Sequence, residues 1–325
     1  MSLLSLMFTT DVSQFCALAK QLAEKLDNLR GVAGSIMFRL LHSTRPRIDG
    51  IPDRFQLERE PMLFPQTLGS TSAINWCMAH DTFPRVVRML DIPEYMEAVL
   101  SGLVISVGGL TESVVKASRG ALLAWYRGHL EAKNYGLLSR TSFFLVTLLT
   151  RHQHDDRVTL PLLKTISILL EEGLLSFLLT TTTEDDQVAS VSPAAKEAAV
   201  KSFAERLYVA VRDEIQRATS IPKLVAGIAV LVGMLPCDTQ EETKVLYALC
   251  LFLSHRFPTV RKATAERLYT RLLVHDEIMR GDDTKYDAVV DLLSATAWDG
   301  PTSNAKAARN ELLGLLGIAP PASKN

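Results

Sequence analysis

The sequence predicts an all-α protein built from stacked helical repeats. Apolar residues recur at helical spacing along almost all of the 325-residue chain, whereas no convincing strand alternation bounded by hairpin turns is present. Glycine and proline divide this pattern into pieces of helix length. One proline-led motif near the C-terminus is also typical of a helical repeat. These three observations together favour a solenoid over an irregular helical domain.

The periodic segments predict helices in chain order, each starting or ending near a helix-breaking residue. Pro93, Pro193, Pro222 and Pro258 lie at or near predicted starts, and Gly317 follows the last predicted end. The predicted helices are 12–42, 93–106, 110–131, 137–151, 158–171, 194–217, 221–234, 240–255, 259–275, 284–296 and 303–316.

Two segments lack the helical spacing of apolar residues. Residues 43–91 contain five prolines and few periodic stretches, which predicts an extended excursion with one short helix. Residues 180–192 form a polar linker with a short acidic cluster. Helices of the same character resume on both sides of each segment, so we expect one continuous domain over residues 11–325.

The motif that indicates the repeat type is HRFPTVRKATAERLY at residues 255–269. It resembles the second helix of a HEAT repeat, in which a proline precedes a Val-Arg pair and small residues follow at helical spacing. Pro258 ends the incoming turn, and Arg261 is long enough to reach an acceptor on a neighbouring turn or repeat. LRGVAGSIM at residues 29–37 repeats the hydrophobe-Arg start. The sequence therefore predicts a HEAT/armadillo-like solenoid.

Composition excludes several classes of protein. Lys and Arg total 35 against 36 Asp and Glu, so the overall charge of a nucleic-acid binder is absent. The four cysteines form no C-x-x-C pair, which argues against a zinc ribbon or a disulfide framework. The longest apolar run, 160–179, contains Lys164, Glu171 and Glu172, so we expect no membrane span. The N-terminus makes a poor signal peptide, and a cytoplasmic location is predicted.

Two short motifs carry residue types found in catalytic or metal sites. HQHDD at residues 152–156 has metal-binding residue types, but an i, i+2 spacing does not place two histidines on one helix face, and a solvated loop is favoured. GGLTES at residues 108–113 lacks the lysine of a phosphate-binding loop, so Gly109 is interpreted as a break and Thr111 as a helix cap. We predict no catalytic residue, metal or cofactor.

Several longer segments resemble the C-terminal region of the tubulin-folding cofactor D family, in the same order along the chain. Only residues 1–10 lack a clear match. The matching segments are EKLDNLRGVAGSIMFRLLH (24–42), INWCMAHDTFPRVVRML (74–90), GLVISVGGLTESVVKAS (102–118), RVTLPLLKTISILLEEG (157–173), LVAGIAVLVGML (224–235), LCLFLSHRFPTVRKATAERLYTRLL (249–273), VVDLLSATAWD (289–299) and ARNELLGLLGI (308–318).

The resemblance implies a chaperone of the microtubule cytoskeleton rather than an enzyme. It implies binding of β-tubulin and αβ-tubulin, cooperation with tubulin-folding cofactors C and E, and association with a small Arf-like GTPase. Stimulation of GTP hydrolysis by tubulin would belong to the complex of cofactors. Two alternatives are a direct GTPase regulator that supplies an arginine and a helical-repeat adaptor for another cargo.

Tubulin is acidic, so exposed basic residues are the natural candidates for a binding surface. We predict that the surface around Arg261, Lys262, Arg267 and Arg271 contacts a partner, although the same residues also fit a solvated face offset by nearby carboxylates. Trp298, at the end of a predicted helix, fits either a partner contact or a packing anchor.

Overall fold

The computed structural model describes residues 12–45, 47–58, 64, 74–180, 193–235, 237, 241–274 and 283–321, with only the backbone at 193–201 and 283. The chain divides into two compact units, residues 1–148 and 149–325. The helical pattern of the sequence runs through residue 148, and it therefore gives no sign of this division.

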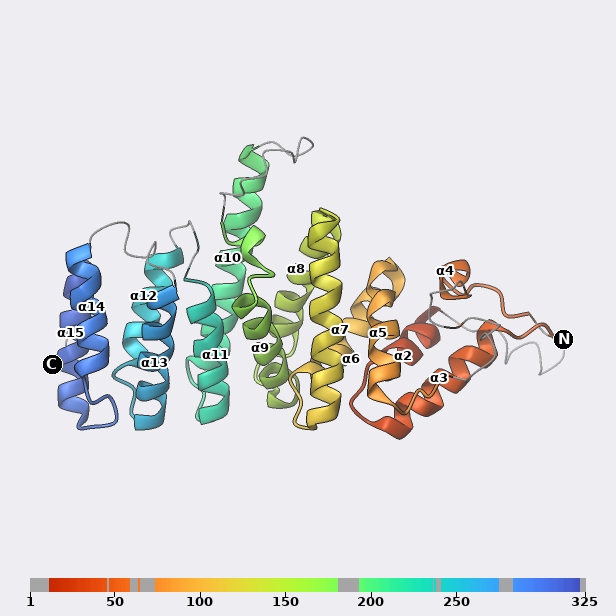
Figure 1. The fold of residues 1–325 in the computed structure, drawn as a ribbon, viewed down its shortest axis with the longest axis horizontal. Helices are drawn as coiled ribbons and strands as arrows, with labels where there is room; N and C mark the ends of the chain where they lie inside the picture. Colours follow the sequence, from red (N-terminus) through yellow and green to blue (C-terminus); the bar gives the residue numbers. More distant parts are fainter. Residues whose placement is uncertain are drawn as a thin grey trace. The chain divides into compact units, whose positions relative to one another are not determined.

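The first unit is built from helices that pack against their neighbours (Figure 1). α2 packs on both α3 and α6, while α7 packs on α5 and α6. Its elements are α2 (Val12–Leu22), α3 (Asp27–Leu41), α4 (Arg54–Glu58), α5 (Ala79–Val86), the 3-10 helix η1 (Val87–Asp91), α6 (Pro93–Val107), α7 (Glu112–Glu131) and α8 (Tyr135–Arg151), which ends in the second unit.

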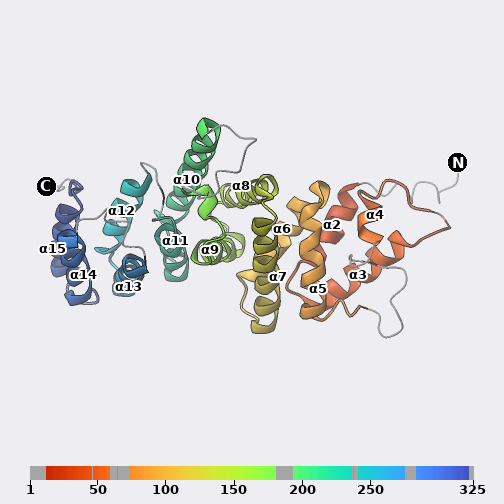
Figure 2. The same cartoon turned by 45° about the horizontal axis from the view of Figure 1, so that its top comes forward.

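The second unit forms two rows of helices, as Figures 1 and 2 show. Helices α9, α11, α13 and α14 contact one another in succession, and α10, α12 and α15 form the other row. The elements are α9 (Asp156–Glu171), η2 (Ser176–Leu178), α10 (Pro193–Ile215), α11 (Ile221–Gly233), α12 (Glu241–Phe252), α13 (Pro258–Val274), α14 (Asp283–Ala295) and α15 (Thr302–Leu315). Consecutive pairs such as α12 and α13 therefore stack as helical repeats.

α11 is the most apolar helix at the centre of this unit. From Leu224 to Gly233 all residues but Val225 are buried, because α9, α10, α12 and α13 surround the helix. A helix that is hydrophobic on all sides needs such cover. Pro222 lies in the first turn, where its missing N–H has no intrahelical partner to lose.

Close helix contact in the first unit depends on a glycine. A Cβ atom at Gly102 in α6 would collide with the backbone carbonyl of Lys20 in α2. Four residues further along α6, the buried Ser106 hydroxyl donates a hydrogen bond to the carbonyl of Ala23 at 2.7 Å. The end of α6 is thus fastened to the turn that follows α2.

The predicted all-α, helical-repeat class is confirmed. Strands are absent from the described residues, which contain one isolated bridge between Thr44 and Arg47. From residue 93 onward every predicted helix is present, with ends that differ by only a few residues. The predicted linker at 180–192 lies outside the described residues except for Thr180, which is not helical.

Two predictions about the first ninety residues were wrong in detail. The single helix expected over 12–42 is two helices, α2 and α3, separated by a turn at residues 23–26. The excursion at 43–91 contains α4, α5 and η1 rather than one short helix. Pro84 inside α5 concealed that helix, because an internal proline usually ends a helix.

Candidate partner surface and buried charges

Arg261, the centre of the predicted partner surface, is buried, with 1% of the residue exposed. Its guanidinium donates to three backbone carbonyls: Nη1 to His255 at 2.8 Å, Nε to Trp298 at 2.7 Å and Nη2 to Gly300 at 2.6 Å. The first acceptor lies in the turn before α13 and the other two lie in the turn between α14 and α15. The expected reach to a neighbouring repeat is therefore observed, whereas the side chain itself is not available to a partner.

Trp298 is also interior. The residue is 5% exposed, and its indole N–H donates to the carbonyl of Leu293 at 2.8 Å. Its own carbonyl accepts from Arg261. Trp298 thus closes the end of α14 and acts as the packing anchor, so its position does not support the alternative of a partner contact.

Arg267 and Arg271 extend from α13 to the C-terminal ends of two preceding helices, α9 and α11. Arg267 lies 3.6 Å from Glu171 at the end of α9. Arg271 donates to the carbonyl of Gly233, the last residue of α11, at 3.2 Å. Burial lowers the pKa of Arg271, although the charge of Glu171 acts in the opposite direction. Cations at helix C-termini are favourable, because the last carbonyls lack intrahelical partners. These two arginines therefore join α13 to α9 and α11.

Lys262 has a more exposed side chain than Arg267, another residue of the predicted surface (58% against 40%). Its ammonium lies 4.0 Å from Glu266 one turn later. Arg256, in the preceding turn, is exposed and lies over the ring of Phe257 at 4.6 Å. The geometry therefore divides the predicted surface: Lys262 remains accessible, Arg267 and Arg271 connect helices, and Arg261 and Trp298 are buried.

A second buried arginine occupies a similar position in the first unit. Arg30 in α3 is 0% exposed and donates to the carbonyls of Glu24 at 3.0 Å and Cys77 at 2.7 Å. It also pairs with Asp27 and lies over the ring of Phe83. The sequence echo between LRGVAGSIM and the motif at 255–269 thus corresponds to a shared arginine anchor.

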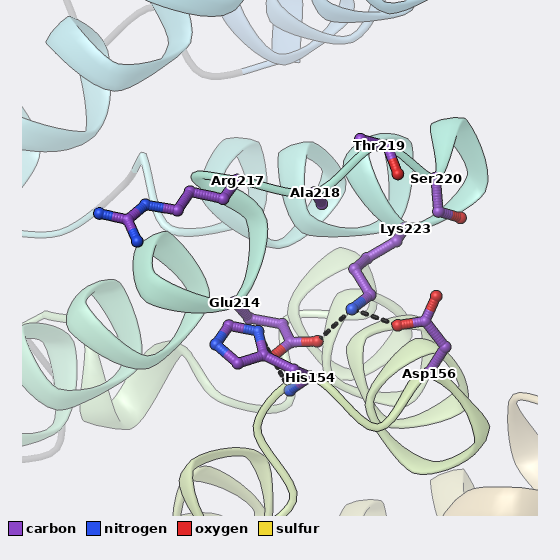
Figure 3. Close-up of a pocket in the computed structure, with 8 residues that line it drawn as sticks. All are labelled: His154, Asp156, Glu214, Arg217, Ala218, Thr219, Ser220 and Lys223. Carbon is purple, nitrogen blue, oxygen red and sulfur yellow. Dashed lines mark hydrogen bonds and ion pairs between the residues drawn. The ribbon is translucent and has the colours of Figure 1, made fainter.

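The HQHDD segment belongs to a charged cluster that joins three helices (Figure 3). Glu214, at the end of α10, is fully buried and accepts from Lys223 Nζ in α11 and from Thr159 Oγ1 in α9, each at 2.6 Å. Lys223 also pairs with Asp156 in the first turn of α9. The backbone N–H of His154 donates to Glu214 at 2.7 Å. Residues 152–155 lie in the loop between α8 and α9, as the favoured interpretation of the motif predicts, and this loop contributes to the cluster through His154.

One cation and two carboxylates meet in this cluster. Burial alone would lower the pKa of Lys223, but the hydrogen bonds and charges of Asp156 and Glu214 outweigh burial and raise it. Lys223 thus keeps its charge between two carboxylates. Arg217 lines the same small pocket but points away from these groups (Figure 3). Sequence reasoning missed Glu214 and Lys223, since nothing along the chain marks two residues that meet only through tertiary packing.

Other predicted features can be placed in the fold. Thr111 is the N-cap residue of α7, as expected, but its side chain makes no capping hydrogen bond. No disulfide links Cys16, Cys77, Cys237 or Cys250 among the described residues. Among the described residues no group of three or more His, Cys, Asp or Glu side chains is arranged to hold a metal. None of the helices in this part of the chain is long and apolar enough to cross a membrane.

Comparison with known families decides the relationship of this chain. The model of the family described as "Tubulin folding cofactor D C terminal" matches residues 12–223. The chain belongs to this family. The resemblance predicted from the sequence is thereby confirmed. The matched range includes Arg30 and the Glu214–Lys223 cluster, whereas Arg261 and its neighbours lie beyond it.

A curated relative supports the same relationship. The chain is 22% identical to Tubulin-specific chaperone D from Dictyostelium discoideum over 290 residues, which are 87% of this chain and 18% of that protein. This member of the cofactor D family therefore spans less than a fifth of the length of that relative. No solved structure gives a significant match.

Proposed function

We propose that this chain is a non-catalytic scaffold region of a tubulin-folding cofactor D that contacts tubulin. The family match over residues 12–223 carries the proposal, and the name of the Dictyostelium relative agrees with it. Stacked helical repeats suit such a role, because successive helix pairs present extended surfaces to a folded partner. No group of residues needs to perform chemistry for this function.

In this proposal the region helps to hold β-tubulin during assembly and disassembly of the αβ-tubulin heterodimer. Cofactors C and E and a small Arf-like GTPase are the further partners. Activation of GTP hydrolysis belongs to the assembled cofactor complex, which acts in the cytoplasm on the microtubule cytoskeleton. These expectations come from the family and apply here to a chain much shorter than its curated relative.

The alternative, in which an arginine of α13 acts directly in a GTPase site, fits the geometry less well than the scaffold role does. An arginine that stabilises the transition state of a GTPase must be exposed and able to enter the nucleotide site. Arg261 donates to three carbonyls inside the protein, and Arg271 donates to the end of α11. Both guanidinium groups therefore serve helix packing.

The test is binding of the purified, helical chain to αβ-tubulin and, separately, to the Arf-like GTPase, measured by interferometry at low and high salt. We expect tubulin binding that weakens as salt rises, since screening reduces attraction between exposed charges. An unrelated folded cargo serves as the control. Absence of tubulin binding by a folded sample, or equal binding of the unrelated cargo, would contradict the proposal.

A further inference from the structure

The end of the second unit formed by the turns before α13 and α15 concentrates positive charge. Arg256 lies in the α12–α13 turn, and Lys262 lies just after the first turn of α13. Arg309 in α15 reaches this turn and donates to Ser254 Oγ at 3.0 Å. Lys306 is three residues before Arg309, hence on the same side of α15. These four residues, Arg256, Lys262, Lys306 and Arg309, form what we call the basic end surface.

Few carboxylates offset this charge. Arg256, Lys306 and Arg309 pair with no carboxylate among the residues that the structure describes; Arg309 bonds to Asn310 and Ser254 instead. Lys262 has one carboxylate at 4.0 Å, that of Glu266. Asp299, in the α14–α15 turn, is exposed and is the acidic residue closest in sequence to the acceptors of Arg261. The surface therefore carries more positive than negative charge.

A buried charge lies directly beneath this surface. Arg261 donates only to backbone carbonyls within the described part of the chain, so its full positive charge is solvated by dipoles and is not cancelled by an anion. The field of a charge in a poorly polarisable interior extends further than that of a solvated one. His255 in the same turn responds to it: burial lowers the pKa of His255, and the charges of Arg256 and Arg261 lower it further.

We propose that the basic end surface is a binding site for an acidic, extended segment of a partner protein. This inference rests on the proposed function, in which that partner is tubulin, and it relocates the contact from the side of α13 to its N-terminal end. An acidic segment fits because exposed cations can steer and hold it with little burial. The uncompensated Arg261 adds attraction without touching the ligand.

The experiment uses the intact chain and a fluorescent peptide of alternating glutamate and glycine, with a glutamine–glycine peptide as its neutral match. Anisotropy measures each affinity between about 50 mM and about 200 mM salt. The variant Arg256→Glu with Lys306→Glu reverses two charges on the basic end surface. Its control, Lys20→Glu with Lys116→Glu, reverses two exposed charges in the first unit. Circular dichroism verifies that each variant is folded.

We expect the acidic peptide to bind, the neutral one not to bind, and the surface variant to lose about tenfold in affinity while the control keeps it. Equal losses in the two variants would show a general charge effect and overturn the proposal. A nucleic-acid duplex that binds as tightly and competes with the peptide would overturn the assignment to an acidic protein segment. Absence of peptide binding would do so as well.

Tubulin binding separates this inference from the proposed function. If tubulin binds the wild type and the surface variant equally, the basic end surface is not the contact, but the scaffold function stands. If the acidic peptide binds with the expected variant pattern while tubulin does not bind, the surface is confirmed and the proposed partner is wrong. Parallel loss of peptide and tubulin binding in the surface variant supports both.

Discussion

Arg30 in the first unit and Arg261 in the second are two copies of one structural device. Each arginine donates to a carbonyl six residues earlier, Glu24 in one case and His255 in the other. Each also reaches a carbonyl in a later turn, Cys77 or both Trp298 and Gly300. Buried residues then follow at the same spacings in the two helices: Ala33, Gly34, Met37 and Leu41 in α3, and Thr264, Ala265, Leu268 and Leu272 in α13.

The two copies differ in charge compensation. Arg30 pairs with Asp27, whose side chain is 63% exposed, so the guanidinium charge is neutralised locally. Arg261 has carbonyl acceptors alone among the described residues. The comparison shows that the same buried-arginine arrangement can have its charge neutralised in one place and produce a positive potential in another. A single nearby carboxylate makes this difference in charge.

The largest expected effect comes from Arg261→Met. One buried and two partly buried carbonyls would lose their donor, and an unsatisfied buried acceptor is costly, so we expect the free energy of unfolding to fall by about 3–5 kcal/mol. Urea denaturation measures the loss, and hydrogen exchange should localise it to α13 and the α14–α15 turn. Arg261→Lys keeps the positive charge but has fewer hydrogen-bond donors, so its free energy of unfolding should lie between those of Arg261→Met and the wild type. A change below about 1 kcal/mol would contradict the anchor role.

Arg30→Met should destabilise less, by about 2–3 kcal/mol. Two carbonyls lose their donor here, and the exposed carboxylate of Asp27 can be hydrated once its partner is gone. Hydrogen exchange should increase in α3 and around Cys77 while α13 stays protected. If Arg30→Met lowers the free energy of unfolding more than Arg261→Met does under the same conditions, the number of carbonyl acceptors does not determine how much each arginine stabilises the fold.

Asp27→Asn converts the neutralised anchor into one that resembles Arg261. We expect a loss of about 1 kcal/mol, because solvent around the 63% exposed Asp27 side chain screens its attraction to the buried Arg30, and the favourable position of an anion in the first turn of α3 contributes little. The measured unfolding free energy should also become less sensitive to salt. A loss as large as that of Arg30→Met would mean that the carboxylate, rather than the two carbonyls, holds the guanidinium in place.

Much of this comparison was present in the sequence. Helical spacing predicted α13 and the reach of Arg261, and the hydrophobe-Arg echo pointed to Arg30. The burial of Arg261 could also have been read from its spacing, since residues 264, 265, 268 and 272 share its helix face. The predicted partner surface includes Arg261 because arginine is mostly exposed in proteins, whereas this long side chain points inward to carbonyls.

Other features depend on tertiary contacts that a one-dimensional pattern does not contain. The break between α2 and α3 has no Gly or Pro; the carbonyls of Ala23 and Glu24 instead accept from Ser106 and Arg30. The Glu214–Lys223 pair likewise forms only when the ends of three helices meet. Local propensity is overridden at such positions by donors from distant parts of the chain.

The positive potential at Arg261 predicts a pH effect through His255. Its folded-state pKa lies below the ordinary value of 6.5, since burial, Arg256 and Arg261 all disfavour the charged ring. The unfolded chain therefore binds the proton more readily, so this contribution to stability is present above pH 6.5 and is lost as pH falls through that value towards the folded pKa.

Proton NMR titration of the imidazole tests this effect. Arg256→Gln should raise the pKa of His255, since one of the two nearby positive charges is removed. His255→Gln should flatten the pH dependence of unfolding in the same range, relative to the wild type. A His255 pKa that does not move in Arg256→Gln would argue against a field shared by this turn, and with it against the basis of the basic end surface.

The smallest effect on stability is expected from Lys262→Ala. Lys262 directly follows Arg261, the residue with the largest expected effect. Adjacent residues point about 100° apart around a helix, so Lys262 faces solvent where Arg261 faces inward. Its carboxylate neighbour among the described residues, Glu266, is also exposed, and such pairs contribute little. We expect the free energy of unfolding to change by less than about 0.5 kcal/mol in urea denaturation. A larger loss would mean that Lys262 also supports the fold, and a binding defect in its variants would then not identify a contact with a partner.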